Sequence, residues 1–172
     1  MLRNALRAVL LDVDFYNRAE IDTRVTWQAG LIVIVASGFA AVGSAVALDD
    51  ASVVATVAGG VLTGITGWIL WSLASWLIGT RVFGGEATFG AMLRVIGFAF
   101  TPLAIGIVPW LGFPGAAWML VAAVVAFREG LDISTAKAIA TMAIGWGLWL
   151  GTTVLLNIVL DFNLDPSWPF PS

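Results

Sequence analysis

The chain contains four long stretches without a single charged side chain. These stretches cover residues 25–48, 51–80, 95–127 and 138–160, and together they make up most of the 172 residues. Each is longer than the roughly 18 apolar residues that identify a candidate membrane span. The sequence therefore indicates an integral membrane protein, and it excludes a soluble globular domain, a disordered chain and a nucleic-acid-binding protein.

The composition narrows the classes of chemistry that are open to the chain. Hydrophobic residues make up 60% of the sequence and charged residues 11%, whereas about a quarter of an ordinary soluble domain is charged. The chain has no Cys and no His, so it lacks disulfides, thiolate ligands, the commonest metal ligand and the usual general base. We therefore expect no catalytic residue, no metal and no cofactor, and we expect a protein that is not an enzyme.

The N-terminal 24 residues carry a helical pattern. Leu2, Leu6, Val9 and Val13 recur at steps of three and four, and arginines recur on another face, which is typical of an amphipathic helix. A helix with an arginine-bearing polar side is expected to lie in the membrane interface. The alternative is a short helix that packs on the protein's own loops.

The charge-free stretches divide the chain into spans. The first span is expected at about 27–48, the second at about 53–79 and the fifth at about 138–160. The fold class that follows is an all-α, polytopic bundle of five transmembrane helices preceded by the amphipathic helix. Its three parts are a cytoplasmic amphipathic segment at 1–24, a five-helix membrane domain at 25–160 and a Pro-rich outer tail at 161–172.

The stretch 95–127 is expected to hold two spans. It contains Pro102, Pro109 and Pro114, and proline breaks the interior of a helix, so one continuous span is excluded. A hairpin with its turn near 110–114 fits better. At about 1.5 Å per residue the stretch is roughly 50 Å long, while two crossings need about 60 Å. The hairpin must therefore borrow flanking residues, or it is re-entrant; both alternatives stay open.

The distribution of basic residues favours five spans. With five spans, segments 1–26, 80–94 and 128–137 share one side and hold all eight basic residues. A single crossing at 95–127 would place Arg128 and Lys137 opposite the other six. The positive-inside rule then predicts a cytoplasmic N-terminus and an outside C-terminus. The arginine-dominated, Ala- and Gly-rich composition favours a prokaryotic plasma membrane.

Arg94 is the charge closest to a span interior. It sits just inside the third span, where its long side chain can reach the lipid headgroups, and a role in setting topology is the simplest interpretation. Glu86 in the preceding loop is a candidate partner for Arg94. Thr88 is a candidate N-cap of the helix that follows, because its hydroxyl can accept a hydrogen bond from an orphaned amide.

Two further patterns concern helix packing. Pro102 leaves the carbonyl one turn earlier without a donor, and the hydroxyl of Thr101 is expected to help satisfy the freed main chain. Such a kink serves ordinary packing or lines a cavity. Pairs of glycines at four-residue spacing allow helices to approach closely and are expected to pack the spans together; they are Gly60 with Gly64 and Gly147 with Gly151.

Three segments carry a resemblance to a known family. Residues 77–99 read LIGTRVFGGEATFGAMLRVIGFA, residues 128–138 read REGLDISTAKA, and residues 10–16 read LLDVDFY. They resemble segments of the bacterial branch of the Ypt-interacting-protein (Yip) domain family, and the resemblance extends over about residues 8–160. It implies a five-helix integral membrane domain with a cytoplasmic N-terminus. The family supplies no catalytic residue, and its frequent acidic residue is replaced here by Ala91.

The function expected from these features is non-enzymatic. We expect a membrane-organising, scaffold or adaptor protein that acts through helix packing and short cytoplasmic loops. Its expected partners are membrane lipids and a second copy of itself or another membrane protein. The alternative is a small transporter or channel for a neutral or lipid-like solute, which a polar cavity beside Thr101 would favour.

Overall fold

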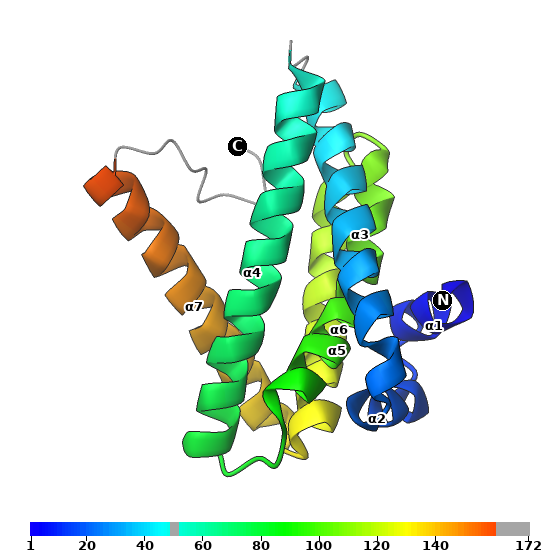
Figure 1. Cartoon of the computed structure of the whole chain (residues 1–172), viewed down its shortest axis with the longest axis vertical. Coiled ribbons are helices and arrows are strands. Elements are labelled where there is room, and N and C mark those ends of the chain that lie inside the picture. The colour runs from blue at the N-terminus through cyan, green and yellow to red at the C-terminus, as the bar shows by residue number, and fades with distance from the viewer. Residues whose placement is uncertain (49–51, 161–172) are drawn as a thin grey trace.

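A computed structural model describes residues 1–48 and 52–160, with the main chain alone at 149–150 and 152–160. All secondary structure in these residues is helical; α3, α4 and the hairpin formed by α5, η2 and α6 run along the longest axis, whereas α7 diverges from α4 (Figure 1). In chain order the elements are α1 (Leu2–Val9), α2 (Val13–Ile21), the 3-10 turn η1 (Thr23–Val25), α3 (Thr26–Ala47), α4 (Val53–Arg81), α5 (Phe89–Ala99), the 3-10 helix η2 (Thr101–Ile107), α6 (Gly112–Leu131) and α7 (Thr135–Leu160).

Within the described residues, four helical stretches are long and apolar enough to cross a membrane. They are Thr23–Ala47, Val53–Arg81, Phe89–Ile107 and Gly112–Leu131. The first two match the spans expected at 27–48 and 53–79 to within a few residues. The fifth expected span falls on α7, which is 26 residues long but is not among the four, so the five-span count stays a prediction. The Pro-rich tail expected at 161–172 lies outside the described residues.

Residues 89–131 form the expected hairpin. The chain reverses between Val108 and Leu111, slightly earlier than the expected turn at 110–114. Pro114 lies in the first turn of α6, where a missing amide hydrogen costs little. The first arm combines 11 α-helical residues with seven 3-10 residues, which rise about 1.5 and 2.0 Å each, so it is about 30 Å long. The 20 residues of α6 also reach about 30 Å, so both arms match the bilayer core.

The first arm changes from α to 3-10 geometry at a proline. α5 ends at Ala99 and η2 begins at Thr101, with Pro102 in its first turn. Pro102 cannot donate to the carbonyl of Phe98, four residues earlier. The hydroxyl of Thr101 donates to that carbonyl instead, at 2.6 Å. The expected hydrogen bond from Thr101 to the freed main chain is therefore present, and it accompanies a change of helix type.

The expectation of a single helix over residues 1–24 is wrong, because this segment forms two helices, α1 and α2. Leu11 has a left-handed main chain with φ of 57°, which ends α1. Asp12 then caps α2 by accepting a hydrogen bond from the amide of Phe15 at 3.0 Å, and it pairs with Arg7 at 2.6 Å. This pair, with the hydrogen bond to the amide, holds the pKa of Asp12 below its ordinary value. The apolar stripe of α1 faces outward, with Leu6 55% exposed.

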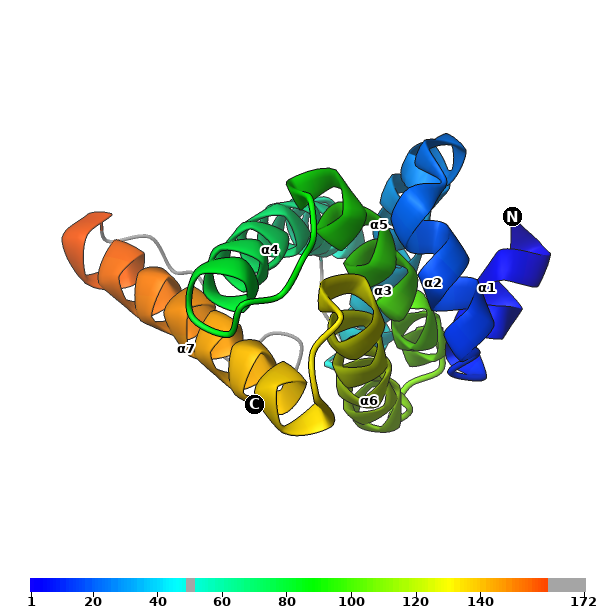
Figure 2. The same cartoon turned by 90° about the horizontal axis from the view of Figure 1, so that it is seen from below.

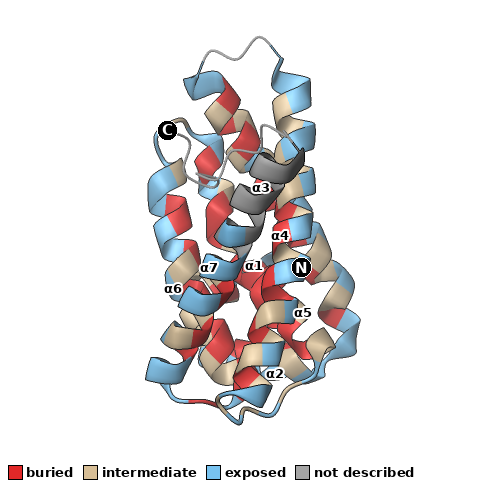
Figure 3. Cartoon of the chain, turned by 90° about the vertical axis from the view of Figure 1, so that its left-hand side faces the viewer, coloured by how far each residue is buried: buried red, intermediate tan, exposed pale blue. Residues whose placement is uncertain are grey.

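α5 is the central element of the bundle. Seen from below, it lies among α2, α3, α4 and α6 (Figure 2). Most of its residues are buried, and the buried faces of the surrounding helices point inward toward the core (Figure 3). The ring of Phe98 meets that of Phe15 edge-on at 4.8 Å, and the ring of Trp71 meets those of Phe100 and Phe127. The N-terminal segment is therefore packed against the helical bundle through α2.

The two glycine pairs differ in what they contact. A β-carbon at Gly60 would lie 2.6 Å from that of Ala41, and one at Gly64 would lie 2.6 Å from that of Ser37. These glycines let α4 approach α3 closely. Gly147 and Gly151 on α7 are exposed, with no described atom within 4 Å of the positions their β-carbons would take. The expectation that this second pair packs the spans together is therefore wrong for the described residues.

The two glycine pairs predict opposite responses to a larger side chain. Gly64→Leu forces leucine against α3, and overpacking of this kind lowers the free energy of unfolding by about 1–3 kcal/mol. Gly147→Leu is the matched control, because the position is open, and it should change that free energy by less than about 0.5 kcal/mol. Chemical unfolding in detergent micelles measures both. Equal losses in the two variants would contradict the packing described for α4.

Candidate functional site

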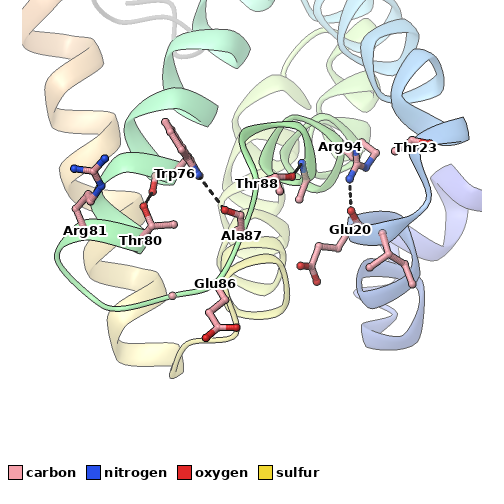
Figure 4. A pocket seen from close by; sticks show the side chains of 12 residues that line it. Glu20, Thr23, Trp76, Thr80, Arg81, Glu86, Ala87, Thr88 and Arg94 are labelled. Carbon is pink, nitrogen blue, oxygen red and sulfur yellow. Dashed lines mark hydrogen bonds between the residues drawn. The ribbon is translucent and has the colours of Figure 1, made fainter.

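A pocket of about 810 Å³ opens at the end of the bundle where α2, the segment 82–88 and the segment 132–134 lie, which we call the loop end (Figure 4). We call this cavity the Arg94 pocket. It is lined by Glu20 and Ile21 in the last turn of α2, by Thr23 of η1, by Trp76, Thr80 and Arg81 of α4, by residues 85–88, and by Ala91 and Arg94 of α5. Two stretches that are distant in the sequence, 20–23 and 76–94, therefore build one cavity.

Arg94 is a buried clamp between two helices. The residue is 6% exposed. Its Nε donates to the carbonyl of Ala19 at 2.9 Å, and its Nη2 donates to the carbonyl of Glu20. Both carbonyls belong to the last turn of α2, where they have no intrahelical donor and where the helix dipole favours a cation. Arg94 therefore caps the C-terminus of α2 and ties the N-terminal segment to α5.

The expected pairing of Arg94 with Glu86 is not what the structure has. The described hydrogen bonds of the guanidinium go to α2, and Glu86 points away from it toward the outside of the loop (Figure 4). Among the described residues the ion pairs are those of Arg7 with Asp12 and of Arg128 with Glu129. The partner of Arg94 lies 74 and 75 residues away in the sequence, and local spacing carries no signal for such a contact.

The segment 82–88 is held in place by hydrogen bonds to its main chain. Trp76 Nε1 donates to the carbonyl of Ala87 at 3.1 Å, and Lys137 Nζ donates to that of Phe83 at 3.0 Å. The amide of Glu86 donates to the carbonyl of Leu131 at 3.1 Å. Gly84 adopts a φ of 71°, which a residue without a β-carbon accommodates readily. The loop is thus bound to α4, α6 and α7.

Thr88 begins α5 as its position in the sequence predicts. Its hydroxyl oxygen accepts a hydrogen bond from the amide of Ala91 at 3.1 Å, and its main chain is extended, as is usual for an N-cap. Ala91 occupies the position where an acidic side chain would complete a capping box. It is buried in the pocket wall instead. The threonine alone therefore caps α5.

Glu20 is the carboxylate most affected by the pocket. Partial burial raises the pKa of the Glu20 carboxyl above its ordinary value, nearby Asp132 raises it further, and Arg94 opposes both effects. An acid whose pKa is raised on folding stabilises the folded state less as the pH increases through that raised pKa. The surroundings of Glu20 therefore destabilise its ionised carboxylate, and a cation close to it would stabilise that charged form.

The remaining candidate residues lie outside the pocket. The hydroxyl of Thr101 is used by the main chain of Phe98, and Pro102 and Leu103 are buried, so the Arg94 pocket is not the polar cavity beside Thr101 that the transport alternative requires. Within residues 1–48 and 52–160, no group of three or more Asp, Glu, His or Cys side chains could hold a metal ion.

A polar cluster on α4 had no signal in the sequence. Trp71 Nε1 and the hydroxyls of Ser72 and Ser75 are buried and have no hydrogen-bond partner among the described residues. A β-carbon at Gly145 of α7 would lie 3.0 Å from Trp71 Nε1 and 3.3 Å from the hydroxyl of Ser75. Trp71 and Ser75 therefore face α7, and the members of the cluster are hidden in the sequence among ordinary small and aromatic residues.

Comparison with known proteins identifies a family. The family described as Yip1 domain matches residues 12–156, which run from the N-cap of α2 into α7 and include every residue of the Arg94 pocket. No curated protein and no solved structure matches the chain.

The clamp predicts a specific effect on the N-terminal segment. Arg94→Gln removes hydrogen bonds from a charged donor, each worth about 1.5–3 kcal/mol, so amide hydrogen exchange in α2 should accelerate at least tenfold. Arg94→Lys keeps the charge but loses the planar fork, and it should give an intermediate rate. Arg81→Gln is the control, because Arg81 is an exposed residue at the pocket rim. Unchanged exchange in Arg94→Gln would show that α2 is held by its apolar contacts alone.

Proposed function

Because the chain belongs to the Yip1 domain family, we propose that this integral membrane protein is a non-enzymatic scaffold that organises other membrane components. It acts through the packing of its helices and through the short segments at the loop end. Its partners are membrane lipids together with a second copy of the chain or another membrane protein.

The observation that supports this proposal is the construction of the loop end. Arg94 ties α2 to α5, Trp76 and Lys137 hold the segment 82–88, and the amide of Glu86 joins that segment to the end of α6. A surface with its main chain fixed by several separate contacts loses little conformational entropy when a partner binds. Preorganised binding, which needs no reacting group, is the use that suits such a surface.

The proposed topology threads the chain five times through the membrane. α7 supplies the fifth crossing, since 26 residues extend about 39 Å. The loop end then faces the cytosol and carries Arg18, Arg24, Arg81, Arg128 and Lys137, as the positive-inside rule requires. The N-terminus lies in the cytosol, the C-terminus outside, and the membrane is the plasma membrane of a prokaryote.

This topology places the end of α1 deep in the bilayer, past the midplane as counted from the cytosol. Trp118 Nε1 donates to the carbonyl of Val9 at 2.8 Å, and Trp118 lies about 20 Å along α6 from Leu131 at the loop end. The end of α1 therefore lies within the thickness of the bilayer. Its leucines face away from the bundle, and Leu2 and Leu10 are the most exposed of them, at 75% and 77%. An apolar stripe at this depth contacts acyl chains.

Single cysteines test the topology and the position of α1, since the chain has none of its own. With an impermeant thiol reagent in intact cells, Ser52→Cys should react, whereas Ser134→Cys should react only after the membrane is opened. Leu6→Cys should react slowly from both sides, because a thiol in lipid does not ionise. Ready labelling of Ser134→Cys in intact cells would overturn the topology, and fast labelling of Leu6→Cys would place α1 in water.

Purification in native-lipid particles tests the scaffold function. The full chain should carry a stoichiometric partner or a second copy. Val82→Asp introduces a charge on an exposed apolar residue at the loop end and should lower the recovered partner severalfold. Val108→Asp makes the same change in an exposed valine at the opposite turn and should leave recovery unchanged. A monodisperse monomer, or equal recovery with both variants, would contradict the proposal.

A further inference from the structure

We propose that the Arg94 pocket binds the headgroup of a zwitterionic aminophospholipid, with the phosphate beside the first turn of α5 and Arg94 and the ammonium beside Glu20. The inference rests on the proposed function for its placement of the pocket at the membrane surface. It needs no protein partner.

The anionic part of the headgroup fits the start of α5. The amides of Phe89 and Gly90 occupy the first turn and have no intrahelical acceptor, and the helix dipole favours a negative charge there. Arg94 adds a second, independent feature. Its Nη1 lies 3.3 Å from the position that a β-carbon of Gly90 would take, and this nitrogen takes no part in the clamp on α2. A buried cation with a spare donor therefore faces the same turn.

The cationic part of the headgroup fits Glu20. The carboxylate of Glu20 forms no ion pair or hydrogen bond among the described residues, and it points into the space below Arg94 (Figure 4). Its main-chain carbonyl, by contrast, is held by Arg94. A partly buried and unpaired carboxylate is costly, and a primary ammonium supplies both a positive charge and three donors.

The charges that face the inside of the pocket favour a zwitterion over an anionic lipid. They are the cation of Arg94 and the carboxylate of Glu20, whereas Glu86 points to the outside of the loop (Figure 4). A headgroup with a net negative charge would leave the Glu20 carboxylate unpaired, whereas one with a phosphate and an ammonium satisfies both signs. Electrostatic complementarity of this kind selects between ligands of the same size.

The position of the pocket favours a lipid over a soluble phosphate compound. Arg81 ends the span Val53–Arg81, and Arg94 lies near the start of the span Phe89–Ile107, so the pocket lies at headgroup level. Ile21 and Trp76 add apolar surface to its wall. A tryptophan whose indole N–H is bonded while its ring stays apolar is typical of the membrane interface, and it suits the glycerol and the first methylenes of a lipid.

Retention of defined lipids tests the proposal. The full chain is placed in nanodiscs with equal amounts of phosphatidylethanolamine, phosphatidylcholine and phosphatidylglycerol, and the retained lipid is counted by native mass spectrometry. We expect phosphatidylethanolamine to be retained severalfold more than phosphatidylglycerol. Phosphatidylcholine should be intermediate, because its ammonium has the charge but no N–H. Glu20→Gln should abolish the preference, whereas Asp14→Asn, an exposed carboxylate of α2 outside the pocket, should keep it.

Several outcomes of this experiment would overturn the proposal. Equal retention of the three lipids, a preference for phosphatidylglycerol, or an unchanged preference in Glu20→Gln would each do so. If soluble phosphoethanolamine, at the same concentration as the lipid, displaced the bound phosphatidylethanolamine, the pocket would be assigned to a free compound. If a basic peptide displaced that lipid, the pocket would be assigned to a protein partner. Val82 does not line the pocket, so Val82→Asp should keep the lipid preference. Failure to recover any partner with the unsubstituted chain, with the lipid preference intact, would contradict the scaffold function alone.

Discussion

A main-chain carbonyl that loses its helical donor inside a bilayer must find another donor within the protein, because lipid offers none. Three carbonyls that lack a helical donor, at two places, organise this molecule, one inside the hairpin and two at the end of α2. Pro102 frees the carbonyl of Phe98, and the neighbouring hydroxyl of Thr101 takes the place of the missing amide. The last turn of α2 frees the carbonyls of Ala19 and Glu20, and Arg94 binds both. The first repair shapes the hairpin, and the second joins the N-terminal segment to it.

These two repairs lie on one arm of the hairpin, and the packing of the bundle follows from them. Arg94 and Phe98 are one turn apart on α5, so the helix that holds α2 by a guanidinium also receives the ring of Phe15 from α2. Beyond Ala99 the chain lengthens into 3-10 geometry, which brings the arm to about the thickness of the bilayer core. The same change brings η2 against α3, where Gly43 and Gly106 meet main chain to main chain.

The loop end combines fixed geometry with unpaired charge. Its segments are held by contacts from α4, α5 and α7, while the carboxylate of Glu20 and a spare donor of Arg94 remain directed at a common space. Rigid walls around uncompensated charges are the physical requirement for selective binding. The span α4, in contrast, carries orphaned polar atoms of Trp71 and Ser75 that face α7 rather than the pocket.

The sequence by itself determined the features that depend on local composition and spacing: the membrane class, the bounds of the first two spans, the hairpin, the cap at Thr88 and the repair at Thr101. It led to one helix where Leu11 and Asp12 separate two, to Glu86 as the partner of Arg94, and to packing at Gly147, which is open. Only the tertiary structure decided these, together with the pocket. The preference of a charge-free segment for lipid is a sum of contributions from its own residues, so the sequence alone reveals it. The partner of a buried arginine, in contrast, depends on which distant carbonyls the fold brings within hydrogen-bonding distance.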